Sequence, residues 1–133
     1  MNRNFKDINA KAAVALPAAG AANFTASIDL GTTLPGPMVD YFDVLVELPA
    51  TPSLVDAKTI TLTLKDSADG VTFTAIPSLA PIVSTGAGGA GAAAISQTYK
   101  LPPTVRRYIR LDQAVLAAGG DNTAVSGSVS LVF

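Results

Sequence analysis

Residues 59–76 read TITLTLKDSADGVTFTAI, and the alternation within this stretch decides the fold class. Its first half alternates threonine with isoleucine or leucine, and its second half, from Val71 to Ala75, alternates apolar residues with threonine. A period of two is typical of a strand with one buried face. The DSADG segment between the halves contains Asp and Ser, which hydrogen-bond their own backbone in turns, and Gly70, which tolerates positive φ. We therefore predict a half-buried β-hairpin that carries no catalytic group.

The same alternation recurs along the chain, between segments rich in proline and glycine. Besides the hairpin, we expect strands over residues 24–30, 41–48, 79–83, 95–101, 105–112 and 125–133. Neither a long helix nor an alternation of strands with helices is indicated. The pattern predicts an all-β protein of about eight strands, folded as an antiparallel β-sandwich with jelly-roll-like connections.

The N-terminal segment differs in composition from the rest of the chain. It carries Arg3, Lys6 and Lys11, followed by an alanine-rich run. We interpret residues 1–21 as an extended N-terminal arm and residues 22–133 as a single β-sandwich domain. Two roles are open for the arm: it lies across a neighbouring subunit, or it is a frayed terminus.

Few charges cover the surface of this small domain. Charged residues make up 14 % of the 133 residues, against roughly 25 % in an ordinary soluble domain, and the mean hydropathy is +0.41. Part of the surface is therefore expected to be hidden against other chains, in a homo-oligomer that is a dimer or a trimer. The alternative is that alanine, glycine and threonine raise the hydropathy without forming adhesive patches.

The charge balance and the apolar pattern argue against several kinds of partner. A formal net charge of −1 offers no basic excess for direct binding of nucleic acid or of an anionic membrane. No apolar run is long enough to form a membrane-spanning helix. Cysteine is absent, which excludes a disulfide framework and suits assembly in a reducing cytoplasm.

The composition also argues against an enzyme. The chain has no histidine and no cysteine, which removes the commonest general base and the thiol nucleophile. Asp43 and Glu47 lie four residues apart on a predicted strand, about 13 Å, which is too far to share a proton. Asp66, Ser67 and Asp69 lack the ligand spacing and the terminal glutamate of an EF-hand, so turn capping is favoured over calcium binding. We expect no catalytic activity, no cofactor and no metal.

Arginine is concentrated in one predicted strand. Arg106 and Arg110 would face the same side of it, with Tyr108 between them and Arg107 on the opposite side. Guanidinium groups bind carboxylates in pairs, so these residues could contact an acidic surface of a partner protein. The alternative is a strand face whose arginines form ion pairs within the chain. Together with the basic residues of the arm, the candidate partner-binding residues are Arg3, Lys6, Lys11, Arg106, Arg107, Tyr108 and Arg110.

Three features together resemble a known family: the N-terminal arm, the hairpin DSADGVTF and the late strand PPTVRRYIRLD. Residues 59–133 are similar to the capsid cement or decoration proteins of tailed bacteriophages, of the Bbp16-like type. The resemblance implies a β-sandwich or jelly roll that binds the outside of an HK97-like shell as a homo-oligomer, near the symmetry axes. It implies the major capsid protein as partner and the capsid exterior of the virion as location, after assembly in the host cytoplasm.

The main alternative is a ligand-binding β-sandwich, such as a carbohydrate-binding or adhesive module of a phage tail or a cell surface. Such sites usually present exposed aromatic side chains to the sugar. This chain has no tryptophan, and its tyrosines, Tyr41, Tyr99 and Tyr108, are scattered among the predicted strands.

Overall fold

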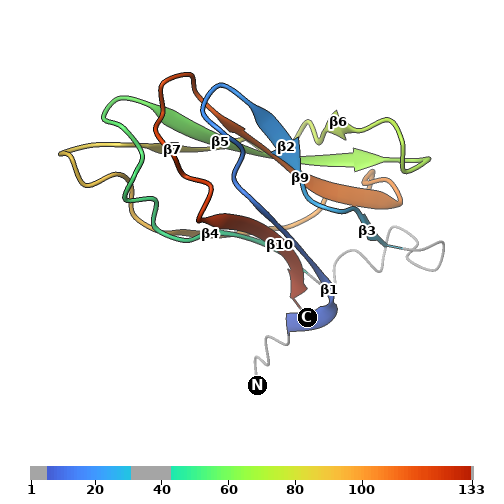
Figure 1. Cartoon of the computed structure of the whole chain (residues 1–133). Coiled ribbons are helices and arrows are strands. Elements are labelled where there is room, and N and C mark those ends of the chain that lie inside the picture. The colour runs from blue at the N-terminus through green and yellow to red at the C-terminus, as the bar shows by residue number, and fades with distance from the viewer. Residues whose placement is uncertain (1–5, 31–42, 133) are drawn as a thin grey trace.

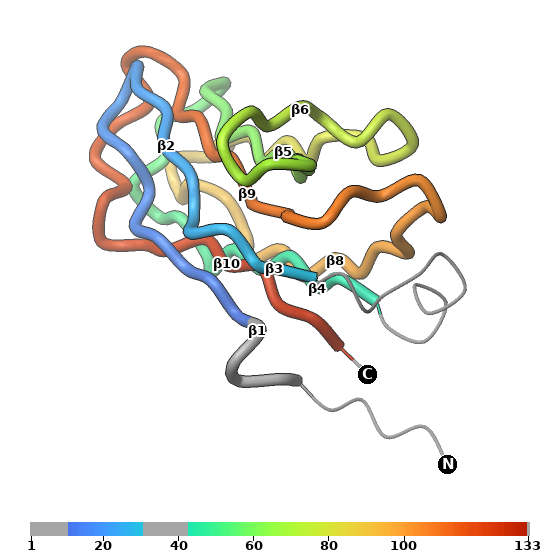
Figure 2. Tube along the Cα trace, turned by 90° about the vertical axis from the view of Figure 1, so that its right-hand side faces the viewer, coloured from blue at the N-terminus to red at the C-terminus, as the bar shows by residue number. Residues whose placement is uncertain are grey.

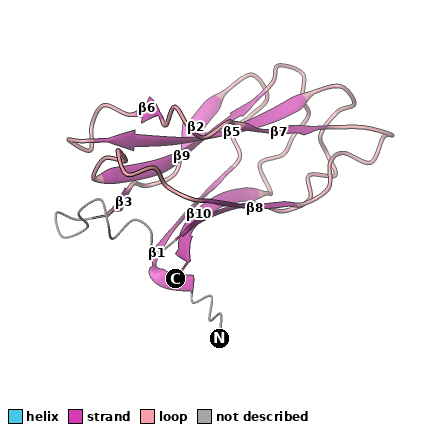
Figure 3. Cartoon of the chain, turned by 180° about the vertical axis from the view of Figure 1, so that it is seen from behind, coloured by secondary structure: helices cyan, strands magenta, loops and turns pink. Residues whose placement is uncertain are grey.

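The structure is a computed structural model that describes the backbone of residues 6–30 and 43–132 and the side chains of residues 11–30 and 43–132. Within these ranges every regular element is a strand and none is a helix (Figure 3). The strands are β1 (Lys6–Ala15), β2 (Ala22–Phe24), β3 (Ile28–Asp29), β4 (Asp43–Leu48), β5 (Thr59–Ser67), β6 (Thr74–Ala75), β7 (Ile82–Thr85), β8 (Ile95–Tyr99), β9 (Tyr108–Val115) and β10 (Ser126–Val132).

Two antiparallel sheets form the two layers of a β-sandwich (Figure 1). One sheet has the strand order β1-β10-β4-β8. The other has the order β2-β9-β5-β6, with β3 also paired to β9 and β7 also paired to β5. The chain crosses from one sheet to the other at most of its connections. The predicted all-β antiparallel sandwich is confirmed, and the jelly-roll connectivity stays a prediction.

The core lies between the sheets and is built mainly from alternate residues of β4, β5, β9 and β10. This alternation agrees with the periodicity of the sequence, because successive side chains of a strand point to opposite faces. Burying each such side chain stabilises the fold by about 1.5–3 kcal/mol. The buried apolar residues of these strands are Val44, Val46, Leu48, Ile60, Leu62, Leu64, Ile109, Leu111, Val115, Val129 and Leu131.

β5 is the predicted strand with one buried face, but its hairpin partner is shorter than predicted. The second run pairs with β5 only at Thr74 and Ala75, and Val71 is 80 % exposed. The Asp69 carboxylate accepts hydrogen bonds from the amides of Val71 and Thr72, which holds these residues in the turn. The rest of that edge of β5 pairs with β7, so two short strands take the place of one.

The predicted strand over residues 24–30 is broken at Thr25. β2 and β3 pair with β9 on either side of the break. Thr25 is buried, and its hydroxyl accepts a 3.1 Å hydrogen bond from the amide of Leu111. The break shifts the alternation, so Phe24 and Ala26 are exposed whereas Ile28 and Leu30 are buried.

The N-terminal segment also differs from the predicted arm. β1 pairs with β10 over Lys11 to Ala15, and the blue trace of β1 and the red trace of β10 can be followed in Figure 2. Leu16 is 2 % exposed in the core, and its amide donates to the carbonyl of Val125. β1 is therefore part of the sandwich, because its inward side chains cover one end of the core. Arg3 and the rest of residues 1–5 lie outside the described residues.

One polar side chain links the two sheets inside the core. Gln113 of β9 is 1 % exposed, and its amide nitrogen donates to the carbonyls of Val14 and Ala15 in β1 and to the side chain of Asn23. Gly127 of β10 makes room for it, since a Cβ at Gly127 would lie 2.0 Å from Oε1 of Gln113. The absence of a side chain at Gly127 is therefore a packing requirement.

We expect Gly127→Ala to destabilise the protein by about 1–3 kcal/mol, the usual cost of overpacking a core. The new methyl group would push Gln113 off its acceptors in β1. Chemical denaturation should show this loss, while Ser126→Ala, on the exposed face of the same strand, should change stability little. In a Gln113→Ala background the methyl group fits, so the cost of Gly127→Ala should shrink; an equal cost in both backgrounds would contradict the packing argument.

Candidate functional site

The outer face of the sheet that contains β5 and β9 carries Arg110, one of the candidate arginines. On β5 this face is a row of threonines ending in Lys65, because the leucines and Ile60 point inward. On β9 it carries Arg110, Asp112 and Ala114, which lie opposite Lys65, Thr63 and Thr61. The surface is therefore rich in hydroxyl and methyl groups and charged at one end.

Arg110 is held between two aromatic rings at that end. Its guanidinium lies 3.8 Å from the ring centre of Phe24 and 4.2 Å from that of Phe73. Nε of Arg110 is 2.7 Å from the Asp112 carboxylate. The same carboxylate forms an ion pair with Nζ of Lys65 at 2.9 Å. Cation–π contacts and charge pairing fix this guanidinium in one orientation. Phe24 was not among the candidate residues, because its alternation with Thr25 indicates a strand and does not show which face is exposed.

Arg106 binds the carboxylate of Asp66, a residue that is only 6 % exposed. Nε and Nη2 of Arg106 donate to Oδ1 of Asp66 at 3.0 and 2.6 Å, and the Arg106 amide donates to Oδ2 at 3.0 Å. Nη2 also donates to the Asp66 carbonyl and to the Thr74 hydroxyl. The hydrogen bond to Asp66 raises the pKa of Arg106. A buried carboxylate is thus fully compensated by one arginine.

Arg107 forms a second, more exposed pair. Its Nε and Nη2 donate to the two carboxylate oxygens of Asp29 at 2.8 and 2.9 Å. This pair raises the pKa of Arg107, whose guanidinium also lies 5.1 Å from the ring centre of Tyr108. Both side chains remain more than 40 % exposed, so the pair is screened by water and ions.

The structure therefore pairs Arg106, Arg107 and Arg110 each with a carboxylate of its own chain, which is the alternative that the sequence left open. The predicted common face of Arg106 and Arg110 was wrong, because β9 begins at Tyr108 and Arg106 lies in the preceding loop. Their contact with a partner stays a prediction. Sequence reasoning could have found the pair of Arg110 and Asp112, which lie two apart on one strand face; nothing in the sequence pointed to Asp66 or Asp29.

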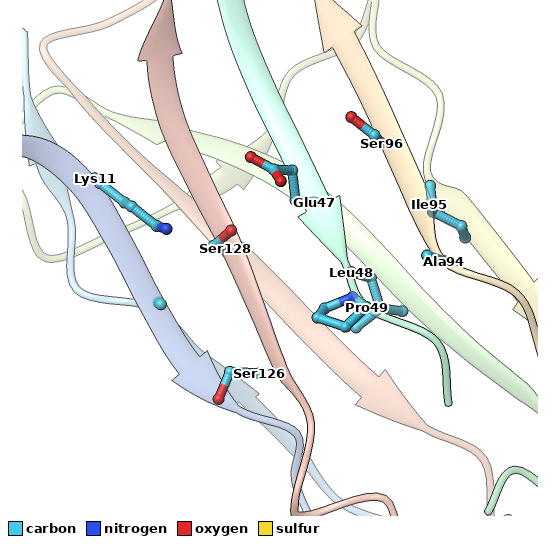
Figure 4. A pocket seen from close by; sticks show the side chains of 10 residues that line it. Lys11, Glu47, Leu48, Pro49, Ala94, Ile95, Ser96, Ser126 and Ser128 are labelled. Atoms are coloured by element: carbon cyan, nitrogen blue, oxygen red, sulfur yellow. The ribbon is translucent and has the colours of Figure 1, made fainter. Parts of the chain in front are cut away.

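Lys11 is the basic residue of the N-terminal segment whose side chain the structure describes, and it is not part of this face. Lys11 is exposed on the outer face of the opposite sheet, where β1 pairs with β10. There it helps to line a shallow hollow of about 350 Å³ together with Glu47, Ser96, Ser126 and Ser128. Figure 4 shows Lys11 and Glu47 on either side of Ser128. The backbone of Lys6 pairs with β10, and its side chain is outside the described residues.

The turn after β5 is capped by its own side chains. Asp69 accepts hydrogen bonds from the amides of Thr72 and Val71 and from the hydroxyl of Ser67. These hydrogen bonds lower the pKa of Asp69 from 3.8 to about 2. In the ranges that the structure describes, no group of three or more acidic residues is placed to hold a metal ion. No helix there has the length and hydropathy needed to cross a membrane.

Comparison of the sequence with models of known protein families gives no match, and comparison with curated proteins gives none either.

We expect Arg106→Ala to lower the melting temperature more than Arg107→Ala. Removing Arg106 leaves the carboxylate of Asp66 buried without its partner, whereas Asp29 is exposed and returns to water. Thermal unfolding followed by circular dichroism measures both. Equal melting temperatures for the two variants would show that the buried pair contributes no more than the exposed one.

We expect Asp69 to make the stability depend on pH in acid. Its pKa is about 2 in the folded state and lies near 3.8 when unperturbed, so its stabilisation is present above about pH 4 and is lost as the pH falls towards 2. Asp69→Asn should lower the melting temperature at neutral pH and lose less of it between pH 4 and pH 2 than the unmodified protein. Parallel melting curves of the two proteins over this range would contradict the assignment.

Proposed function

We propose that this chain is a virion structural protein that binds the outer surface of an icosahedral phage capsid as a homo-oligomer and stabilises it. The observation that carries the proposal is the chemistry of the exposed sheet face. Its charges form ion pairs within the chain, and the rest of the face consists of threonine, alanine and exposed apolar side chains. Such a face suits contact with another protein surface better than it suits catalysis.

Exposed apolar residues mark where contact would be made. Phe24 is 54 % exposed and Val83 is 56 % exposed, and the register places both on the outer side of the sheet with Thr61. A hollow of about 330 Å³ continues this surface, lined by Ala22, Ala114, Thr59 and Leu116. Aromatic and arginine side chains fixed in place, as around Arg110, are the usual energetic centres of an interface.

In the proposed mechanism, the chain stabilises the shell by binding alone and catalyses no reaction. A subunit that binds the assembled shell and not its separate subunits lowers the free energy of the assembled state. Spread over many copies, weak binding at each site adds up to resistance against the internal pressure of packaged DNA. The resemblance of residues 59–133 to capsid decoration proteins supplies the shell as partner and the capsid exterior as the location.

A ligand-binding module is the second candidate, and the hollow beside Lys11 favours it. Lys11, Glu47 and Ser128 present a cation, a carboxylate and a hydroxyl to one small space. Against a sugar site, the hydroxyl of Tyr99 is bound to the carbonyl of Ala80. A signal on a glycan array that Glu47→Gln abolishes would favour this candidate over the first.

We expect the purified protein to co-sediment with empty capsid shells, and Thr61→Arg to weaken this binding at least about tenfold. Thr61 lies in the middle of this face between Ala114 and Val83, so a bulky charge there prevents close contact without breaking an ion pair. Ser126→Arg, on the outer face of the other sheet, is the matched control. If neither variant changes occupancy, or if the unmodified protein stays in the supernatant, the proposed contact is wrong.

A further inference from the structure

The open edges of the two sheets are a further part of the fold that can bind another chain. The last strand of a sheet exposes a row of unpaired backbone groups, which can pair with a strand of another chain. Natural proteins therefore protect their edges with bulges, charges, prolines or very short strands. The described part of this sandwich has four edges that need such protection: β1 and β8 in one sheet, and β2 with β3 and β6 with β7 in the other.

Three of these edges are protected. The pairing of β1 with β10 is interrupted by a register shift between Lys6 and Lys11, and Lys11 is exposed. β2 and β3 are three and two residues long and are separated by the break at Thr25. β6 has two residues, and β7 has four and follows directly on Pro81.

β8 has none of these protections. It reads ISQTY, without a charge or a proline, and pairs with β4 through five consecutive positions without a register shift. Its three central residues, Ser96, Gln97 and Thr98, are all exposed. β4 is the neighbour on one side, and on the other side β8 is the last strand of the sheet among the described residues. A straight, uncharged and exposed edge of this kind is a site for strand addition.

We propose that β8 pairs antiparallel with β8 of a second copy of this chain, around a two-fold axis at Gln97. The two sheets would then join into one continuous sheet, in the order β1-β10-β4-β8 and back again through the second copy. The proposal specifies the homo-oligomer of the proposed function. The biological role of the dimer rests on the proposed function, but the β8 pairing itself does not require a capsid shell.

The sequence of β8 is complementary to itself in this register. With Gln97 opposite Gln97 of the second copy, Ile95 lies opposite Tyr99 of that copy, and Ser96 lies opposite Thr98 of that copy. Each pair thus matches an aromatic ring with a β-branched residue, or two hydroxyl groups, and cross-strand pairs of these kinds stabilise sheets. No like charges meet, since Lys100 lies opposite Ala94 of the second copy. A shift by one residue would place side chains of opposite faces together.

This self-complementarity favours a second copy over a foreign strand. A two-fold axis makes every favourable pair occur twice, as in other isologous interfaces. Five residues on each side form a small interface, so the dimer is weak in dilute solution. Copies held side by side on a surface have a high effective concentration and need no stronger contact.

Charge substitution at Ser96 and Thr98 tests the pairing. Both side chains are exposed on the outer face, opposite Glu47 and Leu45 of β4. Ser96→Lys with Thr98→Lys places lysine opposite lysine twice, and should weaken dimerisation about tenfold or more in sedimentation equilibrium. Ser96→Lys with Thr98→Glu places lysine opposite glutamate twice, and should dimerise at least ten times more tightly than the double lysine variant, with a difference that shrinks in high salt.

The matched control lies in the turn after β5. Val71→Lys with Thr72→Lys adds the same charges at two exposed positions and should leave the dimer unchanged. Far-ultraviolet circular dichroism checks that each variant is folded. A monomer at every concentration of the unmodified protein overturns the proposal, and so does equal dimerisation of the lysine–lysine and lysine–glutamate variants.

A cysteine at the proposed axis gives an independent readout, since the chain has no cysteine of its own. Residues directly opposite in an antiparallel pair have Cα atoms about 4.5–5.5 Å apart, which a disulfide can span. Gln97→Cys should therefore form a disulfide-linked dimer under mild oxidation, and Ser96→Cys, which lies opposite Thr98 of the second copy, should form far less. Equal cross-linking at both positions, or none at Gln97→Cys, would overturn the two-fold pairing and leave the edge to another occupant.

The two proposals fail separately. Dimerisation is measured without any capsid, so loss of shell binding in Thr61→Arg leaves the β8 result untouched. A dimer without affinity for shells would refute the proposed function and retain the β8 pairing. A shell-bound monomer would refute the β8 pairing and the homo-oligomer, and would retain the binding to the shell.

Discussion

The pairing of β5 with β9 is the constraint on which the rest of the structure depends. Their register is unbroken from Ile60 opposite Val115 to Ser67 opposite Tyr108. Because both strands keep a strict alternation over this length, one face buries a continuous apolar layer and the other face is exposed. The same register brings the carboxylate of Asp66 to the start of β9, where Arg106 meets it. Core, exposed face and ion pairs thus follow from one alignment.

The few charges of this protein act mainly within the chain. Arg106 neutralises a carboxylate that burial would otherwise penalise, and Lys65 and Arg110 share one aspartate on the exposed face. This use of charge leaves the outer faces without a strong electric field. Long-range steering of a charged partner is therefore weak, and contact depends on shape and on apolar area. That property agrees with an assembly component placed among neighbours, where partners are already close.

The alternation of apolar and polar residues predicted the fold class correctly, because each long strand buries one face. Val44, Val46 and Leu62 are buried in this way. The alternation did not predict the break at Thr25, which is due to hydrogen bonds with Leu111 of β9, a contact distant in sequence. It also assigned β1 to an arm, because an alanine-rich segment carries too little apolar contrast to predict a strand. Pairing of β1 with β10 supplies the stability that its own residues lack. The arginine partners likewise depend on tertiary contacts that spacing does not encode.

An unprotected edge in a fold that protects its others needs a physical explanation. The chain could have placed a lysine in β8, as it does in β1, at almost no cost to folding, because Ser96 and Thr98 are exposed and contribute little to the core. An uncharged edge makes the protein prone to aggregation. A monomer would carry this risk without any benefit. A closed two-fold pair removes that hazard, because each edge is covered by its copy and no further strand can add. The absence of charge in β8 is thus better explained by a partner than by folding.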